Sequence, residues 1–241
     1  PYNLDMLRSQ ARNGVKKGMS LYQVERIPFE RLADEGWILQ QDTLDRQGRL
    51  SAMTQSEWKR LCLAASDLPG FEAWAAIHQG ELAAALITNQ MDDTFCVPYA
   101  ASHRKFLSQH VNNVLFYVVS TNFLARPGIN GIFFTLQSLD APPSVDEFKF
   151  RMGLIPRSVR QRVVFHPCLH PLTGRNSLTI LNKLTNRYPK KAALAKAEGM
   201  LRFYIEGKIS LAEQEWPEFL SEEKIAYLQR GSIINKYVKS R

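Results

Sequence analysis

The chain has 241 residues, enough for one domain with a full core and a small addition, and it contains no apolar run of about 18 residues, which excludes a membrane-spanning helix. The net charge of +8 is carried by the two ends, because residues 25–167 hold 14 basic and 15 acidic residues. This balance argues against a broad nucleic-acid-binding face on the body of the chain, although the basic ends could steer a phosphate-rich cofactor or RNA.

The cysteines and histidines predict neither disulfides nor a metal site. Cys62, Cys96 and Cys168 are scattered and odd in number, and the five histidines show no His-x-x-x-His spacing. The first residues lack the basic-then-apolar pattern of a secretory signal, so we expect a soluble, cytoplasmic protein with reduced thiols. The sequence starts at a proline and not at a methionine, which suggests that earlier residues are missing.

The first 70 residues are predicted to form a helix, a strand and two further helices. The first helix is basic and amphipathic and should end at Gly18. The third begins at a capping box, since Thr54 and Glu57 have the required spacing. The predicted bounds of the four elements are residues 3–17, 21–27, 28–44 and 54–65.

The central stretch begins with a β-hairpin. Residues 71–78 and 81–89 have the length and composition of strands, and Gly80 supplies the positive φ that the turn between them needs. A third strand, residues 94–102, contains Pro98, which cannot donate a hydrogen bond to a neighbouring strand. We therefore predict that the pairing of this strand is interrupted or bulged at Pro98, where a wedge could open.

A helix, a strand, a short helix and a final strand are expected next, with bounds at residues 113–125, 129–137, 145–152 and 158–165. Asn112 or Asn113 is the predicted N-cap of the first of these helices. A helix between two apolar strands is a crossover, so the strands on either side of it should lie parallel.

Beyond Pro167 the strand pattern gives way to helical signals. Residues 178–184 and 190–205 carry apolar side chains at helical spacing, and Ser210 and Glu213 form a further capping box. These features predict a helical C-terminal extension.

This order of elements, with a proline-broken strand before the central helix, resembles the GNAT N-acyltransferase superfamily. A closer likeness is to the branch that includes the FemAB-type aminoacyltransferases and related uncharacterised GNAT proteins. It rests on Tyr99-Ala-Ala-Ser102 before the central helix and on Asp146-Glu-Phe-Lys-Phe-Arg-Met-Gly153 between the last two strands. The resemblance covers about two thirds of the chain. It implies an α/β fold with a mixed sheet, in which residues 1–173 form the GNAT-like domain and residues 174–241 the extension.

The resemblance implies an acyl-CoA donor whose pyrophosphate lies at the N-terminus of the central helix, where free backbone N–H groups meet the positive end of the helix dipole. The residues expected to contact the donor are Asn112, Asn113, Val114, Arg104 and Lys149. Many GNAT proteins carry glycines at this helix start, whereas residues 108–114 contain none. The FemAB branch also tends to lack them, and its donor is an aminoacyl-tRNA.

The expected catalytic residues are Tyr99, Asp140 and Gln137. Acyl transfer to an amine needs a group that accepts a proton and one that returns a proton to the leaving group. Tyr99 is a candidate acid for the leaving thiolate, against an alternative role in packing. Asp140, three residues after the predicted parallel strand at residues 129–137, is the first choice for the base, and Gln137 is the last residue of that strand.

The sequence thus predicts an N-acyltransferase, in the first place an N-acetyltransferase, which moves an acyl group from acetyl-CoA or another acyl-CoA to an amine of a small molecule or a cell-envelope sugar precursor. One alternative is a FemAB-like aminoacyl-tRNA-dependent transferase, with tRNA as a partner. Another is a non-catalytic GNAT-like interaction protein. A homo-oligomer is compatible with each.

Overall fold

The structure, a computed structural model, describes residues 2–47, 53–135, 144–156, 163–189, 191–210, 212–214, 216, 220–222 and 224–229. The chain divides into two compact units, Pro1–Leu154 (unit 1) and Ile155–Arg241 (unit 2). The expected domains, residues 1–173 and 174–241, remain a prediction. Within the described ranges, no helix combines the length and the apolar character needed to cross a bilayer.

Unit 1 is built on a mixed sheet whose strands follow one another in chain order, from β1 to β5. The first four strands pair antiparallel, and β4 pairs with β5 in parallel across the crossover helix. The predicted mixed α/β fold with its GNAT-like order of elements is confirmed in these respects. The strands are β1 (Gln23–Ile27), β2 (Phe71–His78), β3 (Glu81–Met91), β4 (Thr94–Ser102) and β5 (Gly131–Phe133).

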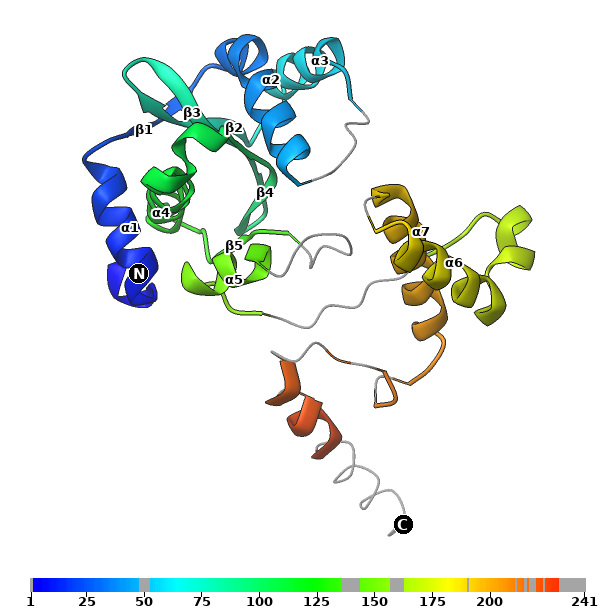
Figure 1. Ribbon diagram of the computed structural model, residues 1–241. Coiled ribbons are helices and arrows are strands. Elements are labelled where there is room, and N and C mark those ends of the chain that lie inside the picture. Colours follow the sequence, from blue (N-terminus) through cyan, green and yellow to red (C-terminus); the bar gives the residue numbers. More distant parts are fainter. Residues whose placement is uncertain are drawn as a thin grey trace. The chain divides into compact units, whose positions relative to one another are not determined.

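Helices cover both faces of the sheet: α2 and α3 lie on one face and α4 on the other (Figure 1). Both faces are apolar because successive side chains of a strand point to opposite sides of the sheet. In β3, Leu86 packs in the cluster on the α4 face, and Ile87 packs in the cluster under α2 and α3. The predicted capping box at Thr54 and Glu57 opens α3. The helices of unit 1 are η1 (Leu4–Met6), α1 (Ser9–Met19), α2 (Phe29–Arg46), α3 (Gln55–Ser66), η2 (Arg104–Gln109), α4 (Val111–Leu124) and α5 (Ser144–Arg151).

The N-terminal helix differs from its prediction at both ends. A 3-10 turn precedes it, and α1 continues through Gly18 to Met19. The reason is packing: a Cβ on Gly18 would lie 2.8 Å from the Cβ of Val114, and one on Gly14 would lie 3.0 Å from Nδ1 of His110. The two glycines, four residues apart on one helical face, therefore let α1 approach the start of α4 closely.

Two predicted strands are shorter than expected or absent in their described part. The strand expected at residues 129–137 is described only to residue 135, and β5 within it has three residues. Of the strand expected at residues 158–165, residues 158–162 lie outside the description, and residues 163–165 are irregular. Alternation of apolar residues therefore does not make Val163–Phe165 a strand.

A buried ion pair ties the start of β2 to the end of α4. The carboxylate of Glu72, which is 8% exposed, accepts hydrogen bonds from both Nη atoms of Arg126 at 2.6 and 3.0 Å and from Nε1 of Trp74 at 2.9 Å. Burial alone would raise the pKa of Glu72, but these hydrogen bonds and the charge of Arg126 outweigh it and lower the pKa. The Arg126 guanidinium also stacks over the ring of Phe123, 4.7 Å from its centroid.

Unit 2 is helical in its described part, as the sequence predicts. It contains η3 (Pro167–Leu172), α6 (Arg175–Arg187) and α7 (Ala192–Glu206), and the last two pack against each other (Figure 1). Few of its described side chains are buried; Leu201 and Thr173 are the clearest examples.

Candidate functional site

The middle of β4 carries a β-bulge. Tyr99 pairs with Ile87 of β3, and the next pair is Cys96 with Asn89, so β4 advances three residues while β3 advances two. The extra residue lies at Val97 and Pro98, where proline has no N–H to contribute to the ladder. The predicted interruption at Pro98 is confirmed.

Before the bulge, over Thr94–Cys96, β4 pairs with β3 on one side and β5 on the other. After the bulge, β4 pairs with β3 alone among the described residues. β5 pairs with β4 over Thr94–Cys96 alone. From the bulge to Ser102, no strand in the described ranges pairs with the second edge of β4, and Pro98 and Ala100 are exposed. The parallel pairing therefore ends just before the bulge, and we call the unpaired edge of β4 from Pro98 to Ser102 the wedge. An unpaired strand edge presents backbone N–H and C=O groups to an extended ligand.

Tyr99 lies in this wedge, on the face of the sheet covered by α2 and α3. Its half-buried ring meets the ring of Trp58 edge to face at 6.0 Å between centroids. Its hydroxyl makes no hydrogen bond to any residue that the structure describes. The packing role and a chemical role are thus compatible, because the ring is fixed while the hydroxyl is unengaged.

The start of α4 differs from the prediction in its cap. The N-cap is His110, whose φ of 63° is left-handed, and not Asn112 or Asn113. The backbone N–H groups of Asn113 and Val114 both donate to the carbonyl of His110, at 3.0 and 3.2 Å. The side chain of Val114 is buried in the core. The N–H groups left for a ligand at this terminus are therefore those of Val111 and Asn112.

Arg104, an expected donor contact, is held by two carboxylates of α2. Its backbone N–H donates to Asp42 at 2.7 Å, and its guanidinium contacts the side chains of both Asp42 and Asp45. Burial raises the pKa of Asp42, but the hydrogen bonds and charge of Arg104 outweigh this and lower it. This arrangement fixes the loop after β4 to the C-terminal turn of α2.

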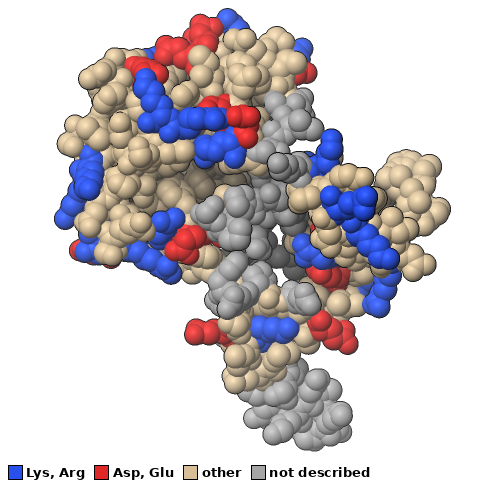
Figure 2. Space-filling model, viewed as in Figure 1, with Lys and Arg blue, Asp and Glu red and all other residues tan. Residues whose placement is uncertain are grey.

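The other cations near the expected donor site are also paired. Lys149 Nζ lies 3.1 Å from Asp146 on its own helix, with only 11% of its side chain exposed. Lys105 Nζ lies 2.8 Å from Glu81. Figure 2 shows that basic and acidic side chains adjoin one another over unit 1 on the visible face. A phosphate contact from Arg104 or Lys149 would therefore compete with these carboxylates.

Two of the expected catalytic residues, Gln137 and Asp140, lie outside the described residues. Their positions relative to Tyr99 therefore stay predictions. Within the described ranges, no group of three metal-ligating side chains is present.

The sequence reasoning missed a polar contact between the end of β4 and α2. The hydroxyl of Thr43 donates to the carbonyl of Ser102 at 3.0 Å and accepts from its N–H at 2.9 Å. Arg46 Nη2 lies 3.4 Å from Oγ of Ser102. No local sequence motif predicts this contact, because Thr43 and Ser102 are 59 residues apart. A buried threonine on the inner face of a predicted helix was the available signal.

No family model matches the chain. A search of the curated proteins gives no match either. Solved structures similar to it include an aminoglycoside acetyltransferase from an uncultured soil metagenomic sample in complex with sisomicin, with 13% identity, a TM-score of 0.46 and coverage of 61% of this chain and 96% of that one.

Two further similar structures are a possible acetyltransferase from Clostridium difficile 630, with 9% identity, a TM-score of 0.49 and coverage of 61% and 99%, and the glucosamine-6-phosphate N-acetyltransferase of Arabidopsis thaliana, with 10% identity, a TM-score of 0.45 and coverage of 60% and 99%. Identities and TM-scores of this size leave the reaction and the substrates of this chain open.

Proposed function

We propose that the chain is a GNAT-type N-acyltransferase that moves an acyl group, acetyl in the first place, from acyl-CoA to an amine of a small molecule or a cell-envelope sugar precursor. The observation that supports the proposal is the end of the parallel pairing: β4 and β5 pair over Thr94–Cys96 alone, and β4 bulges directly after it, at Val97 and Pro98. The extended thioester arm of the donor would lie along the wedge and pair with this unpaired edge of β4.

The unpaired edge also suits the chemistry of acyl transfer. When the amine attacks the thioester carbonyl, the oxygen gains negative charge, and a backbone N–H fixed in a strand can stabilise that charge without rearrangement. Tyr99 would return a proton to the leaving thiolate, since its hydroxyl is unengaged among the described residues. Asp140 would accept the proton of the amine, and Gln137 would help to orient it.

The donor phosphates would lie at the start of α4. Because the N–H groups of Asn113 and Val114 are bonded to His110, we assign the phosphate contact to the backbone of Asn112. Arg104 and Lys149 would add to it only after release from their carboxylates. We therefore expect weaker donor binding than a helix start with free cations would give.

Thermal shift measurements with acetyl-CoA test the proposal. A donor that binds only the folded protein at 100 times its Kd stabilises it by about 2.7 kcal/mol, which corresponds to a rise in Tm of about 5–10 °C for unit 1. Ala100→Trp fills the wedge from an exposed position and should abolish the rise. Met91→Trp, at a position 60% exposed at the far end of β3, is the control and should keep it. A rise that survives Ala100→Trp would place the donor elsewhere.

A FemAB-like transferase is the second candidate, favoured by the paired cations and by the absence of glycine at residues 108–114. Its donor is an aminoacyl-tRNA. A shift with aminoacyl-tRNA that exceeds the shift with deacylated tRNA, and none with acetyl-CoA or free CoA, would decide for it. No shift with any of these ligands would favour the non-catalytic interaction protein.

A further inference from the structure

The charge of this protein is divided between its two units. Unit 1 holds 15 basic and 16 acidic residues, and unit 2 holds 16 and 7. Within unit 2 the charge is also unevenly distributed. Residues 155–197 hold nine basic residues and no Asp or Glu, while residues 198–241 hold seven basic and seven acidic residues. The whole excess of positive charge therefore belongs to one segment, which contains α6 and the first turn of α7.

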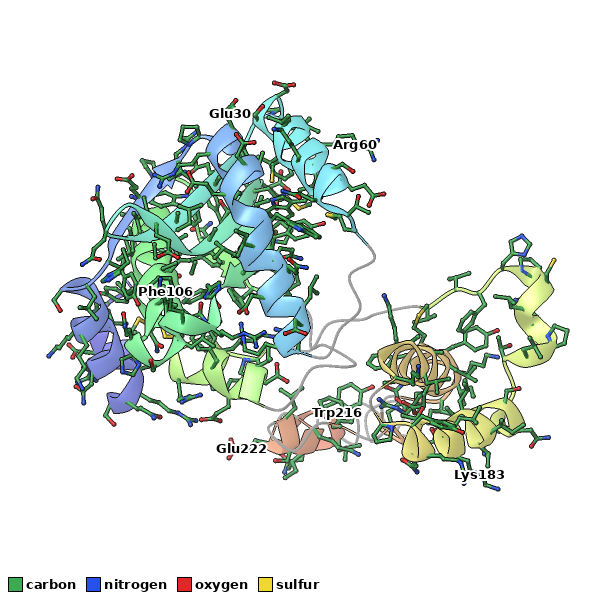
Figure 3. The ribbon with its side chains drawn as sticks, turned by 45° about the horizontal axis from the view of Figure 1, so that its top comes forward. Glu30, Arg60, Phe106, Lys183, Trp216 and Glu222 are labelled. Carbon is green, nitrogen blue, oxygen red and sulfur yellow. The ribbon has the colours of Figure 1, made fainter. Side chains whose placement is uncertain are left out.

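The cations of this segment are on the surface where the structure describes them. Arg175, Lys183 and Arg187 of α6 are exposed, and so are Lys191 and Lys196 beside and within α7. Lys183 points away from α7 (Figure 3), and Arg187 follows it by four residues on the same helical face. Figure 2 shows Lys and Arg side chains gathered over α6 and α7.

The acidic residues of unit 2 do not neutralise these cations in the described ranges. Glu198 and Glu206 both pair with Arg202 of their own helix, at 3.3 and 3.8 Å. Glu213 accepts hydrogen bonds from Ser210 at 2.8 and 3.2 Å. Among the described residues, no carboxylate therefore forms an ion pair with the exposed cations of α6.

The neighbours of these cations indicate the kind of partner. Four of the exposed positions between Arg175 and Arg187 carry amide or hydroxyl groups, which donate hydrogen bonds to phosphate and sugar oxygens; they are Asn176, Thr179, Asn182 and Asn186. Two others, Ile180 and Leu184, are apolar. A helix that binds a membrane surface instead directs its Leu-rich face into the lipid. In α6, Leu178 and Leu181 are half-buried, and the exposed apolar residues are Ile180 and Leu184, at 59% and 38%.

We propose that the exposed face of α6, with Lys191 and Lys196, binds the phosphodiester backbone of a nucleic acid. The 13 residues of α6 span about 20 Å, the length of about six nucleotides of a duplex strand. Binding through phosphates is independent of base sequence and falls steeply with salt. This inference does not rest on acyl transfer and is tested without a donor or an acceptor.

The test measures fluorescence anisotropy of the full chain with a labelled RNA hairpin and a labelled DNA duplex, each of about 20 nucleotides per strand, between 50 and 200 mM salt. Replacing Arg175, Lys183 and Arg187 together by Gln removes three phosphate contacts. The slope of log K against log salt should then fall in magnitude by about 2–3, and affinity at 100 mM salt should fall at least about tenfold. The RNA and DNA arms identify which nucleic acid is bound.

A matched control removes three exposed cations of unit 1, Lys16, Lys17 and Arg60, by the same change to Gln. It should leave the slope unchanged. Arg175→Lys with Arg187→Lys keeps the charge and should also keep the slope, which separates electrostatic loss from unfolding of α6. Absence of binding to both probes at 50 mM salt would overturn the proposal, and so would an equal loss in the control. Binding to phosphatidylserine vesicles in place of both probes would overturn it in favour of a membrane surface.

Discussion

Removing Arg126 should destabilise unit 1 strongly, because it would leave a buried carboxylate without its main partner. The perturbation is Arg126→Met, which keeps much of the side-chain length over Phe123 and deletes the charge. Glu72 would retain the hydrogen bond from Trp74 and a distant contact with Arg26, whose Nη1 lies 4.0 Å away. Neither replaces the two short hydrogen bonds from the guanidinium.

The size of the effect follows from the geometry. Breaking a buried ion pair by removing one partner costs about 3–5 kcal/mol. Arg126 is 32% exposed in its side chain and Arg26 can compensate in part, so we expect the lower end, about 3 kcal/mol. At an m-value of about 2 kcal/mol/M in urea, the unfolding midpoint should fall by about 1.5 M. Replacing both Glu72 and Arg126 by Met should recover more than half of the loss, because no unpaired charge then remains.

Urea unfolding followed by tryptophan fluorescence measures this directly, since Trp74 contacts the carboxylate. The pH dependence supplies a second readout. The folded-state pKa of Glu72 is lowered, so its stabilisation is fully present above the unfolded value near 4.5 and is lost as pH falls through the folded value. Arg126→Met should lose this acid sensitivity. A midpoint within about 0.3 M of the parent, with the same acid profile, would refute the reasoning.

Three further results are expected. Tyr99→Phe should lower any acyl-transfer rate by about 100-fold or more while leaving Tm unchanged, since only the hydroxyl is lost; an unchanged rate would remove Tyr99 from the site. Gly153→Ala should destabilise unit 1 by about 2 kcal/mol or more in urea unfolding, because φ is +81° and the new Cβ would lie 2.8 Å from the carbonyl oxygen of Met6. Exposed Cys168 should react with a thiol reagent at pH 8 in the native state, whereas Cys62, whose pKa burial raises to about 12, should react only on unfolding.

The sheet could be predicted because its signals are local. Gly80 with its φ of 86° makes the hairpin turn, apolar runs of strand length predict β2 and β3, and the missing N–H of Pro98 predicts the bulge from one residue. The parallel placement of β4 and β5 follows from the helix between them. Each of these inferences needs only residues near one another in sequence.

The site could not be predicted where interacting side chains come from distant parts of the sequence. Nothing near Arg104 shows that Asp42 and Asp45, about sixty residues earlier, hold its guanidinium. Gly18 has the local appearance of a helix end, and only its contact with Val114 explains why the helix continues. Asparagine is a favoured N-cap, yet the left-handed backbone at His110 starts α4 earlier.

The double attachment of the end of β4 to α2 has a mechanical consequence. The hydroxyl of Thr43 binds both the N–H and the carbonyl of Ser102, and Arg104, two residues later, is held by Asp42 and Asp45 in the same turn of α2. The end of β4, the 3-10 helix η2 after it and the first residues of α4 are thereby attached to α2. A displacement of α2 should therefore move the end of β4 and the N-terminus of α4 with it.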